Sequence, residues 1–283
     1  MNTRILFVKR PTGWVDLSCF AVDHAPESDL GPQDVRVQAL YLSTDPYLRG
    51  RMNEGPSYAP GFELGKPVVS RVVGRVIETR HAGFKEGDFV WGFLDWAERT
   101  VVPRGEGLHR IDPALGPVSM AISALGMPGL TAWIGAIDLG HPKPGDTVFI
   151  SSAAGTVGQL AGQFARRAGA RVVGSAGSDE KVDFVLRRCG FDAAFNYKDG
   201  PVSRQLREAA PDGIDVYFDN VGGEHLEAAI GSLRLGGRVA VCGMISVYND
   251  TEAAPGPRNP ARPIHTRGRI QGLLVGDHYD LAG

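Results

Sequence analysis

The sequence predicts an α/β protein in which a doubly wound parallel sheet follows an N-terminal β domain. Three observations predict this fold. Residues before about 115 form short strand patterns between Gly and Pro turns, strand and helix patterns alternate regularly after that point, and a glycine-rich turn joins the first strand of this alternation to its first helix. A chain of 283 residues suits two such domains, which we place at residues 1–120 and 121–283.

Four strands are predicted in the β domain. Val35–Leu42 alternates with a period of two. Val68–Ile77 is rich in β-branched residues and contains Gly74, where we expect a bulge or a bend. Phe89–Phe93 and Glu98–Val102 complete the set. Short strands between tight turns are typical of a small barrel or sandwich.

An uncharged stretch follows, residues 113–137, and it is long enough to cross a bilayer. Pro and Gly interrupt it, and Ser and Thr add polar groups. We therefore expect a buried helix, a break at Met127-Pro128-Gly129 and a second helix rather than a membrane span.

The second domain is predicted to contain six strands and four helices. The strands are at residues 147–151, 171–174, 193–196, 214–219, 237–242 and 269–275, and the helices at 155–168, 178–188, 202–210 and 223–235. This alternation indicates a parallel sheet with helices on both faces.

A glycine-rich loop at residues 151–158, Ser-Ser-Ala-Ala-Gly-Thr-Val-Gly, joins the first of these strands to the first helix. It matches the pattern A-x-G-x-x-G. Gly155 lets the main chain approach a pyrophosphate, Gly158 lets the helix pack closely on the strand, and the helix N-terminus favours anions. The loop therefore predicts a dinucleotide site, with a tight turn that binds no nucleotide as the alternative.

The residues after the second strand indicate which dinucleotide binds. NAD sites usually carry an acidic residue about 20 positions after the loop, at the end of that strand. Here Gly174 occupies this region and is followed by Ser175-Ala176-Gly177-Ser178, so no carboxylate ends the strand. The space can take a 2′-phosphate that Lys181 neutralises, which predicts NADPH. A solvated helix lysine is the alternative for Lys181.

The composition excludes several classes of protein. Lys and Arg number 30 against 32 Asp and Glu, and a formal charge of −2 gives no field for a nucleic acid partner. The three cysteines, Cys19, Cys189 and Cys242, are too far apart for a disulfide scaffold or a four-cysteine zinc site. The N-terminus shows no signal peptide, so a cytoplasmic location is expected.

Seven motifs in order resemble one family. They are Asp45-Pro46-Tyr47-Leu48-Arg49, Leu-Gly-Met-Pro-Gly-Leu-Thr-Ala at 125–132, the glycine loop, Gly177–Lys181, Phe-Asn-Tyr-Lys at 195–198, Tyr-Phe-Asp-Asn-Val-Gly-Gly at 217–223 and Cys-Gly-Met-Ile-Ser-Val-Tyr-Asn at 242–249. From about residue 5 to the end, the chain resembles the zinc-independent medium-chain dehydrogenase/reductases of the prostaglandin reductase (leukotriene B4 12-hydroxydehydrogenase) and plant double-bond reductase type.

The resemblance implies a GroES-like β domain, a Rossmann domain and an active site in the cleft between them. It implies NADPH-dependent reduction of the C=C bond of an α,β-unsaturated ketone or aldehyde, by hydride transfer to the β-carbon. It assigns Tyr47 and Tyr248 to the substrate. The cofactor residues that it implies are Gly155, Thr156, Val157 and Gly158 at the pyrophosphate, Lys181 and Tyr197 at the 2′-phosphate, and Asn220, Cys242, Gly243, Ile245, Ser246, Tyr248, Leu273, Leu274 and Val275 beside the nicotinamide.

Two features depart from the family pattern. Trp133 stands where the family usually has Tyr. The family also continues beyond the position of Gly283 with a helix and strands that return to the first domain and supply one more nucleotide-contacting Asn, so this return segment is expected to be absent here. The resemblance further implies a homodimer that pairs through an edge strand at Arg269–Val275.

The residues themselves favour chemistry without a metal. The segment Phe62–Lys66 has no histidine where a zinc alcohol dehydrogenase would need one, and the seven histidines show no paired spacing. Tyr248 follows the carboxyl end of a predicted strand and is the candidate donor to the enolate oxygen, with a packed loop tyrosine as the alternative. A quinone reductase of the same superfamily and an NADPH-binding protein without turnover remain alternative functions.

Overall fold

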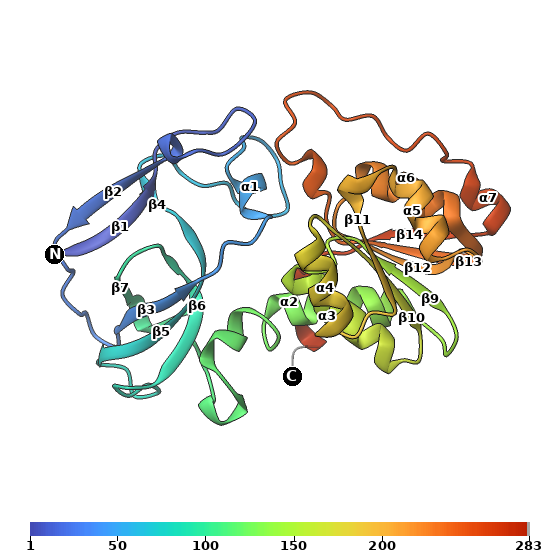
Figure 1. Cartoon of the computed structure of the whole chain (residues 1–283). Coiled ribbons are helices and arrows are strands. Elements are labelled where there is room, and N and C mark those ends of the chain that lie inside the picture. The colour runs from blue at the N-terminus through green and yellow to red at the C-terminus, as the bar shows by residue number, and fades with distance from the viewer. Residues whose placement is uncertain (282–283) are drawn as a thin grey trace. The chain divides into compact units, whose positions relative to one another are not determined.

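The computed structural model describes residues 1–281, and the chain divides into two compact units (Figure 1). The first comprises Met1–Ser123 and the second begins at Ala124, three residues after the predicted boundary. Each unit has its own sheets and its own apolar core.

The first unit contains two antiparallel sheets. One has the order β2 (Phe20–Ala25), β1 (Asn2–Phe7), β4 (Lys66–Pro67), and the other has the order β7 (Arg99–Val102), β3 (Val35–Leu42), β5 (Val69–Thr79), β6 (Phe89–Asp95), β8 (His109–Arg110). The short helix α1 (Leu48–Arg51) lies between β3 and β4 in sequence. All four predicted strands are present, and β1, β2, β4 and β8 are additions that the sequence pattern did not reveal.

Gly74 lies at an irregularity, as predicted. Ala39 pairs with Gly74 and Tyr41 pairs with Val73, so the extra residue, Leu40, is in β3 rather than in β5. A Cβ on Gly74 would lie 2.7 Å from the carbonyl oxygen of Gln38 and would collide with the side chain of Val37. The bulge therefore requires a residue without a side chain opposite it.

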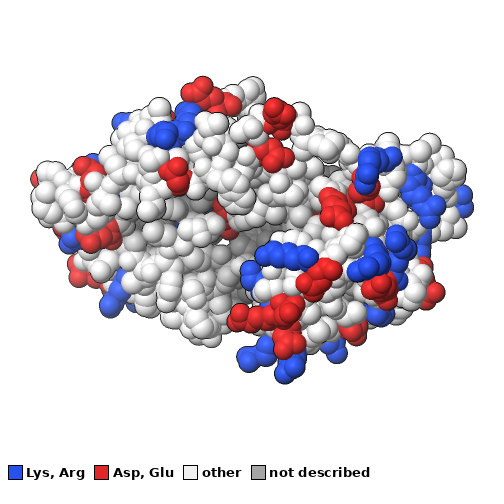
Figure 2. Space-filling model, turned by 45° about the horizontal axis from the view of Figure 1, so that its top comes forward, with Lys and Arg blue, Asp and Glu red and all other residues white. Residues whose placement is uncertain are grey.

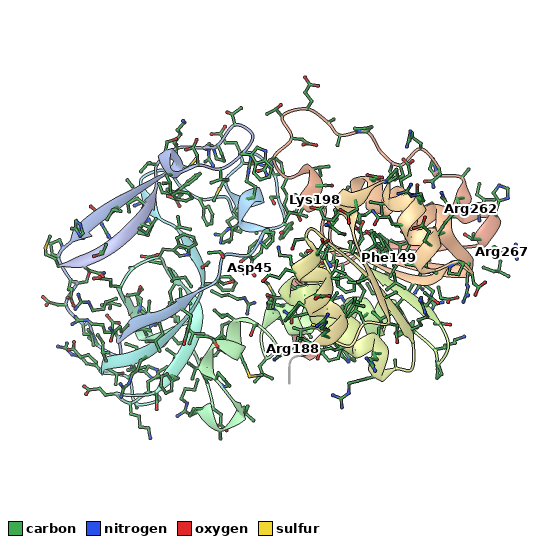
Figure 3. All side chains as sticks on the ribbon, in the orientation of Figure 1. Asp45, Phe149, Arg188, Lys198, Arg262 and Arg267 are labelled. Carbon is green, nitrogen blue, oxygen red and sulfur yellow. The ribbon has the colours of Figure 1, made fainter. Side chains whose placement is uncertain are left out.

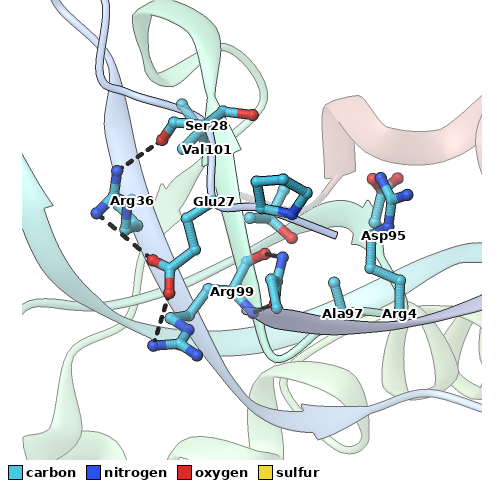
Figure 4. Close-up of a pocket in the computed structure, with 11 residues that line it drawn as sticks. Arg4, Glu27, Ser28, Arg36, Asp95, Ala97, Arg99 and Val101 are labelled. Carbon is cyan, nitrogen blue, oxygen red and sulfur yellow. Dashed lines mark hydrogen bonds and ion pairs between the residues drawn. The ribbon is translucent and has the colours of Figure 1, made fainter. Parts of the chain in front are cut away.

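A network of ion pairs connects the segment that follows β2 to strands β3 and β7 of the larger sheet. Glu27 binds Arg99 at 3.0 Å and Arg36 at 3.6 Å, and Arg36 also binds Glu78 at 2.8 Å. Glu27, Arg36 and Arg99 line a polar pocket that Figure 4 shows. Because its arginines are matched by carboxylates, we interpret this pocket as a structural feature.

The uncharged stretch differs from its prediction. Its first half forms two 3-10 turns, Pro113–Leu115 and Val118–Ile122, and the expected helix there is wrong. Met127-Pro128-Gly129 is the first turn of helix α2 (Met127–Trp133) rather than a break, because proline suits a position whose N–H needs no helical partner. A π-helical segment, Ile134–Leu139, continues from α2. Throughout residues 1–281, no helix combines the length and the apolar character that a bilayer crossing requires.

The second unit is built on one parallel six-stranded sheet (Figure 1). The spatial order is β11 (Ala193–Asn196), β10 (Arg171–Ala176), β9 (Thr147–Ile150), β12 (Ile214–Asp219), β13 (Leu233–Val241), β14 (Arg269–Gly272). Besides α2, the helices of this unit are α3 (Thr156–Arg167), α4 (Asp179–Arg187), α5 (Val202–Ala209), α6 (Gly223–Ser232) and α7 (Arg262–Thr266).

This strand order confirms the doubly wound Rossmann fold. The direction of winding reverses between β9 and β12, and ligands of such sheets bind where the carboxyl ends of these two strands meet. Several boundaries were predicted wrongly: β13 begins at Leu233 rather than at Gly237, and β14 ends at Gly272 rather than at Val275. Helix α6 ends at Ser232, before the predicted Leu235, because Leu233 already has extended backbone, is buried and pairs with Ile214 in the sheet.

Aromatic stacking organises one face of this sheet. Phe149 on β9 stacks on Tyr217 of β12, with ring centroids 5.0 Å apart, and on Phe195 of β11 at 5.9 Å. Figure 3 shows Phe149 among the strands. On the face shown in Figure 2, Lys and Arg side chains lie among Asp and Glu side chains, with uncharged areas between these groups.

His225 on α6 is a buried titratable residue of the second unit. Its side chain is 5% exposed, and no partner for its Nε2 exists among the described residues. Burial lowers the pKa of His225 from 6.5 to about 4, since the charged ring would lose its hydration. The folded protein therefore keeps this imidazole neutral.

We predict that His225 makes the protein sensitive to mild acid. Between pH 6.5 and about 4 the unfolded chain protonates this imidazole and the folded chain does not, so the free energy of unfolding falls as the pH falls through this window. The loss should reach about 3 kcal/mol. Urea titrations at several pH values should show a smaller acid-dependent loss for His225→Phe. Equal losses in the two proteins would contradict this assignment.

Candidate active site

The glycine loop presents an open helix N-terminus. Gly155 is the N-cap of α3 and provides no side-chain cap, so the amides of Thr156, Val157 and Gly158 have no acceptor among the described residues. Gly155 and Thr156 are exposed, and the Gly155 amide donates to the Ser152 carbonyl at 2.9 Å. Uncapped amides at the positive end of a helix suit a phosphate.

Gly158 allows the close packing that the sequence predicted. A Cβ at this position would collide with the carbonyl oxygen of Ser152 and would lie 3.0 Å from the Cα of Ala153. Because both neighbours are backbone atoms, they cannot turn aside. The residues of this loop therefore fit a pyrophosphate.

The end of β10 leads into a second part of the site. Ser178 caps α4 by accepting a hydrogen bond from the Lys181 amide at 3.4 Å, with Asp179 and Glu180 in the first turn as predicted. The Lys181 side chain is exposed and has no carboxylate within ion-pair distance in the described part of the chain. It is available for an anionic ligand.

Tyr197 lies near the segment between β10 and α4. It follows β11, and its hydroxyl lies 3.1 Å from the position that a Cβ on Gly177 would occupy. Its ring packs edge-on against His225, with centroids 5.2 Å apart. The structure therefore brings Gly177 and Tyr197 together at the neighbouring ends of β10 and β11, where a 2′-phosphate would lie.

Hydrogen bonds join β9 to β12 at the point where the winding reverses. The Asn220 side-chain Nδ2 donates to the Ser151 carbonyl at 2.8 Å, and the Asn220 backbone amide donates to the Ser151 Oγ at 3.0 Å. The Tyr217 hydroxyl is 2.9 Å from the same Oγ and 2.7 Å from the Asp219 Oδ1. One N–H of the Asn220 side chain is therefore used to hold β12 to the end of β9.

Asp219 connects this network to the loop after β13. Its backbone carbonyl accepts hydrogen bonds from the amides of Cys242 at 2.8 Å and Gly243 at 3.0 Å. The next residue, Asn220, accepts one from the Ile245 amide at 3.3 Å. Ser246 donates from its amide to the Val221 carbonyl at 3.1 Å. The predicted residues of the 242–248 loop are therefore held against the end of β12.

Tyr248 closes this loop with its hydroxyl directed inward. The Met244 amide donates to the Tyr248 hydroxyl oxygen at 3.3 Å, and a Cβ on Gly243 would lie 3.2 Å from that oxygen. Burial raises the pKa of Tyr248, so its hydroxyl stays protonated at neutral pH. Because the oxygen accepts from the backbone, its own proton is free to be donated to a ligand.

Burial also decides the state of Cys242. It raises the pKa of this thiol to about 12, and the nearby Asp219 carboxylate adds to the effect. A thiol of this kind is not a nucleophile at neutral pH. Cys242, which directly follows β13, is therefore a packing residue rather than a nucleophile.

Leu273, Leu274 and Val275 follow β14 directly. The Leu273 amide donates to the Val241 carbonyl at 2.9 Å, which places these residues beside the end of β13. The predicted nicotinamide-side residues therefore follow the ends of three neighbouring strands, β12, β13 and β14.

Tyr47 belongs to the first unit. It precedes α1, is half-buried and packs against the apolar cluster that includes Phe7, Leu48 and Phe62. Burial, with a contribution from the Asp45 carboxylate, raises the pKa of Tyr47. Within residues 1–281, no three His, Cys, Asp or Glu side chains come together as a metal site would need.

The sequence analysis missed the hydrogen-bonding partners behind the site. Ser151, Tyr217 and Asp219 are all buried, and although they stand in quoted motifs, none was given a role. These residues could have been found because they are polar residues at the ends of otherwise apolar strands. A buried hydroxyl or carboxyl group requires a hydrogen-bonding partner.

The comparisons with known proteins agree with this geometry. A family model described as "N-terminal domain of oxidoreductase" matches residues 3–111, and one described as "Zinc-binding dehydrogenase" matches residues 156–283. The 2-alkenal reductase (NADP(+)-dependent) of Nicotiana tabacum is 47% identical over 254 residues, which cover 89% of this chain and 74% of that protein.

Two further relatives extend the comparison. Prostaglandin reductase 1 of Mus musculus is 42% identical over 246 residues, which cover 86% of this chain and 72% of that protein. The crystal structure of CurA from Vibrio vulnificus in complex with NADPH has a TM-score of 0.92 at 34% identity, and covers 99% of this chain and 84% of CurA. The chain therefore belongs to the zinc-independent medium-chain dehydrogenase/reductases of the double-bond reductase type.

Proposed function

We propose that the protein is an NADPH-dependent oxidoreductase that reduces the C=C bond of α,β-unsaturated ketones and aldehydes. The observation that carries the proposal is the row of site residues along the carboxyl edge of the sheet. Relatives named as 2-alkenal and prostaglandin reductases, and a similar structure that holds NADPH, support it.

The strand order gives each part of the cofactor a place in this proposal. Lys181 and Tyr197 at the ends of β10 and β11 would hold the 2′-phosphate. The uncapped amides of α3, after the central strand β9, would hold the pyrophosphate. The loops after β12, β13 and β14 would border the nicotinamide. This assigns the second unit as the NADPH-binding domain and the first as the substrate domain, with Tyr47 as a substrate contact.

Tyr248 would donate a hydrogen bond to the carbonyl oxygen of the substrate. When bound, NADPH supplies a hydride to the β-carbon of the substrate. Negative charge then develops on the carbonyl oxygen, and a neutral hydroxyl aimed at this oxygen stabilises it. The Tyr248 hydroxyl would serve as this donor, since it is protonated at neutral pH and its oxygen is held by the Met244 amide. The α-carbon then takes a proton from Tyr248 or from water.

We predict enone-dependent oxidation of NADPH by the purified protein. The loss of absorbance at the nicotinamide band should require a simple enone or enal, and should be much slower with NADH. Turnover with quinones alone would instead favour a quinone reductase. Saturable NADPH binding without turnover on either substrate class would indicate a nucleotide-binding protein.

Replacing Tyr248 by Phe should lower kcat about 100-fold, since one donor to a developing oxyanion is worth about 3 kcal/mol. The Kd for NADPH should change much less than kcat, because the ring remains and the loop keeps its backbone hydrogen bonds to Asp219, Asn220 and Val221. Stopped-flow hydride transfer and fluorescence titration measure the two quantities. An unchanged kcat would remove Tyr248 from the chemistry.

We also propose that the protein acts as a cytoplasmic homodimer. β14 lies at the edge of the six-stranded sheet, and all four of its residues are exposed, with Ile270 at 45%. An exposed edge strand is a template for pairing with a second copy. The three cysteines are free, which suits a reducing compartment.

The edge-strand assignment predicts that Ile270→Lys disrupts the dimer, since a charge on an edge strand opposes pairing. Light scattering after size exclusion should give the mass of two chains for the wild type and of one chain for the variant. Leu17→Lys, at a 90% exposed site in the first unit, is the matched control and should stay dimeric. A monomeric wild type would contradict the proposal.

A further inference from the structure

We propose that Asn196 determines the selectivity for the phosphorylated cofactor. Its amide holds the carboxylate of Asp179 and at the same time fixes the turn that carries Tyr197. The inference rests on the proposed use of NADPH and concerns the adenosine end of that site.

Both polar atoms of the Asn196 side chain are engaged. Its Nδ2 donates to the Asp179 Oδ1 at 2.9 Å, and its Oδ1 accepts from the Lys198 amide at 3.2 Å. Asn196 is the last residue of β11, and Asp179 is the first residue of α4, after β10. One side chain therefore ties together the two turns that border the 2′-phosphate position.

The hydrogen bond from Asn196 to Asp179 acts on the negative charge beside the 2′-phosphate position. Asp179 lies in the same helical turn as Lys181, at the place where a carboxylate would repel a 2′-phosphate. The amide of Asn196 holds Oδ1 toward β11 and partly offsets its charge. An acidic residue at position 196 would lose the donor and place a second carboxylate beside the first.

The hydrogen bond from the Lys198 amide to Asn196 fixes the position of Tyr197. It caps the single 3-10 turn Tyr197–Asp199. This turn directs the Tyr197 hydroxyl toward Gly177, while the buried ring of His225 supports Tyr197 from the side. Asn196 is thus a positioning residue for the tyrosine as well as a partner of the aspartate.

The test uses Asn196→Asp, which preserves the acceptor for the Lys198 amide, removes the donor to Asp179 and adds one negative charge. Fluorescence titration should show NADPH binding weakened about tenfold and NADH binding nearly unchanged, as one added charge near the phosphate requires. Competition titrations with 2′,5′-ADP and 5′-AMP, which differ by the 2′-phosphate, test the same contact. Only 2′,5′-ADP should bind more weakly to the variant than to the wild type.

A charge swap provides the rescue. In the double variant D179N/N196D, the amide at 179 can donate to the carboxylate at 196, and the net charge equals that of the wild type. It should recover most of the lost preference for NADPH. Gln163→Glu adds one exposed carboxylate on α3 and should leave the NADPH-to-NADH ratio of Kd values unchanged.

The outcomes separate the two proposals. If the wild type prefers NADPH but Asn196→Asp weakens both cofactors equally, or the swap fails to restore the ratio in a folded protein, Asn196 does not set selectivity. If the folded wild type binds neither NADPH nor 2′,5′-ADP, the proposed function itself is wrong and this inference falls with it.

Discussion

Asp219 accepts five hydrogen bonds at the end of β12, and the geometry of the candidate site depends on them. Its Oδ1 receives the Tyr217 hydroxyl and the amides of Val221 and Gly222, and its carbonyl receives the amides of Cys242 and Gly243. Burial raises the pKa of Asp219, and the three donors to Oδ1 oppose that rise. Oδ1 has the partners that a buried carboxyl group requires, whereas Oδ2 is buried and has none among the described residues.

The hydrogen bonds of Asp219 connect two parts of the candidate site, the end of β9 and the loop after β13. Through Tyr217 and Ser151 it joins β12 to β9, next to the helix N-terminus suited to phosphates. Through its carbonyl it holds the loop that ends in Tyr248. One buried residue thus connects the uncapped N-terminus of α3 to the loop that carries the Tyr248 hydroxyl.

The sequence predicted those features that depend on local pattern. β11 and β12 match their predicted bounds because each is an apolar run between turns. The stretch before Met127 was predicted wrongly, since apolar composition does not distinguish a helix from 3-10 turns around Pro113 and Pro117. The Ser151–Asn220 and Asn196–Asp179 bonds depend on which strands are neighbours, and only the sheet order gives this.

The most direct test of the account is the fate of the transferred hydride. The protein would be incubated with NADPH deuterated at C4 of the nicotinamide and a simple enal, and the product examined by NMR. The account predicts a saturated aldehyde with deuterium on the β-carbon. Deuterium on the carbinol carbon of an unsaturated alcohol would show carbonyl reduction and would contradict it.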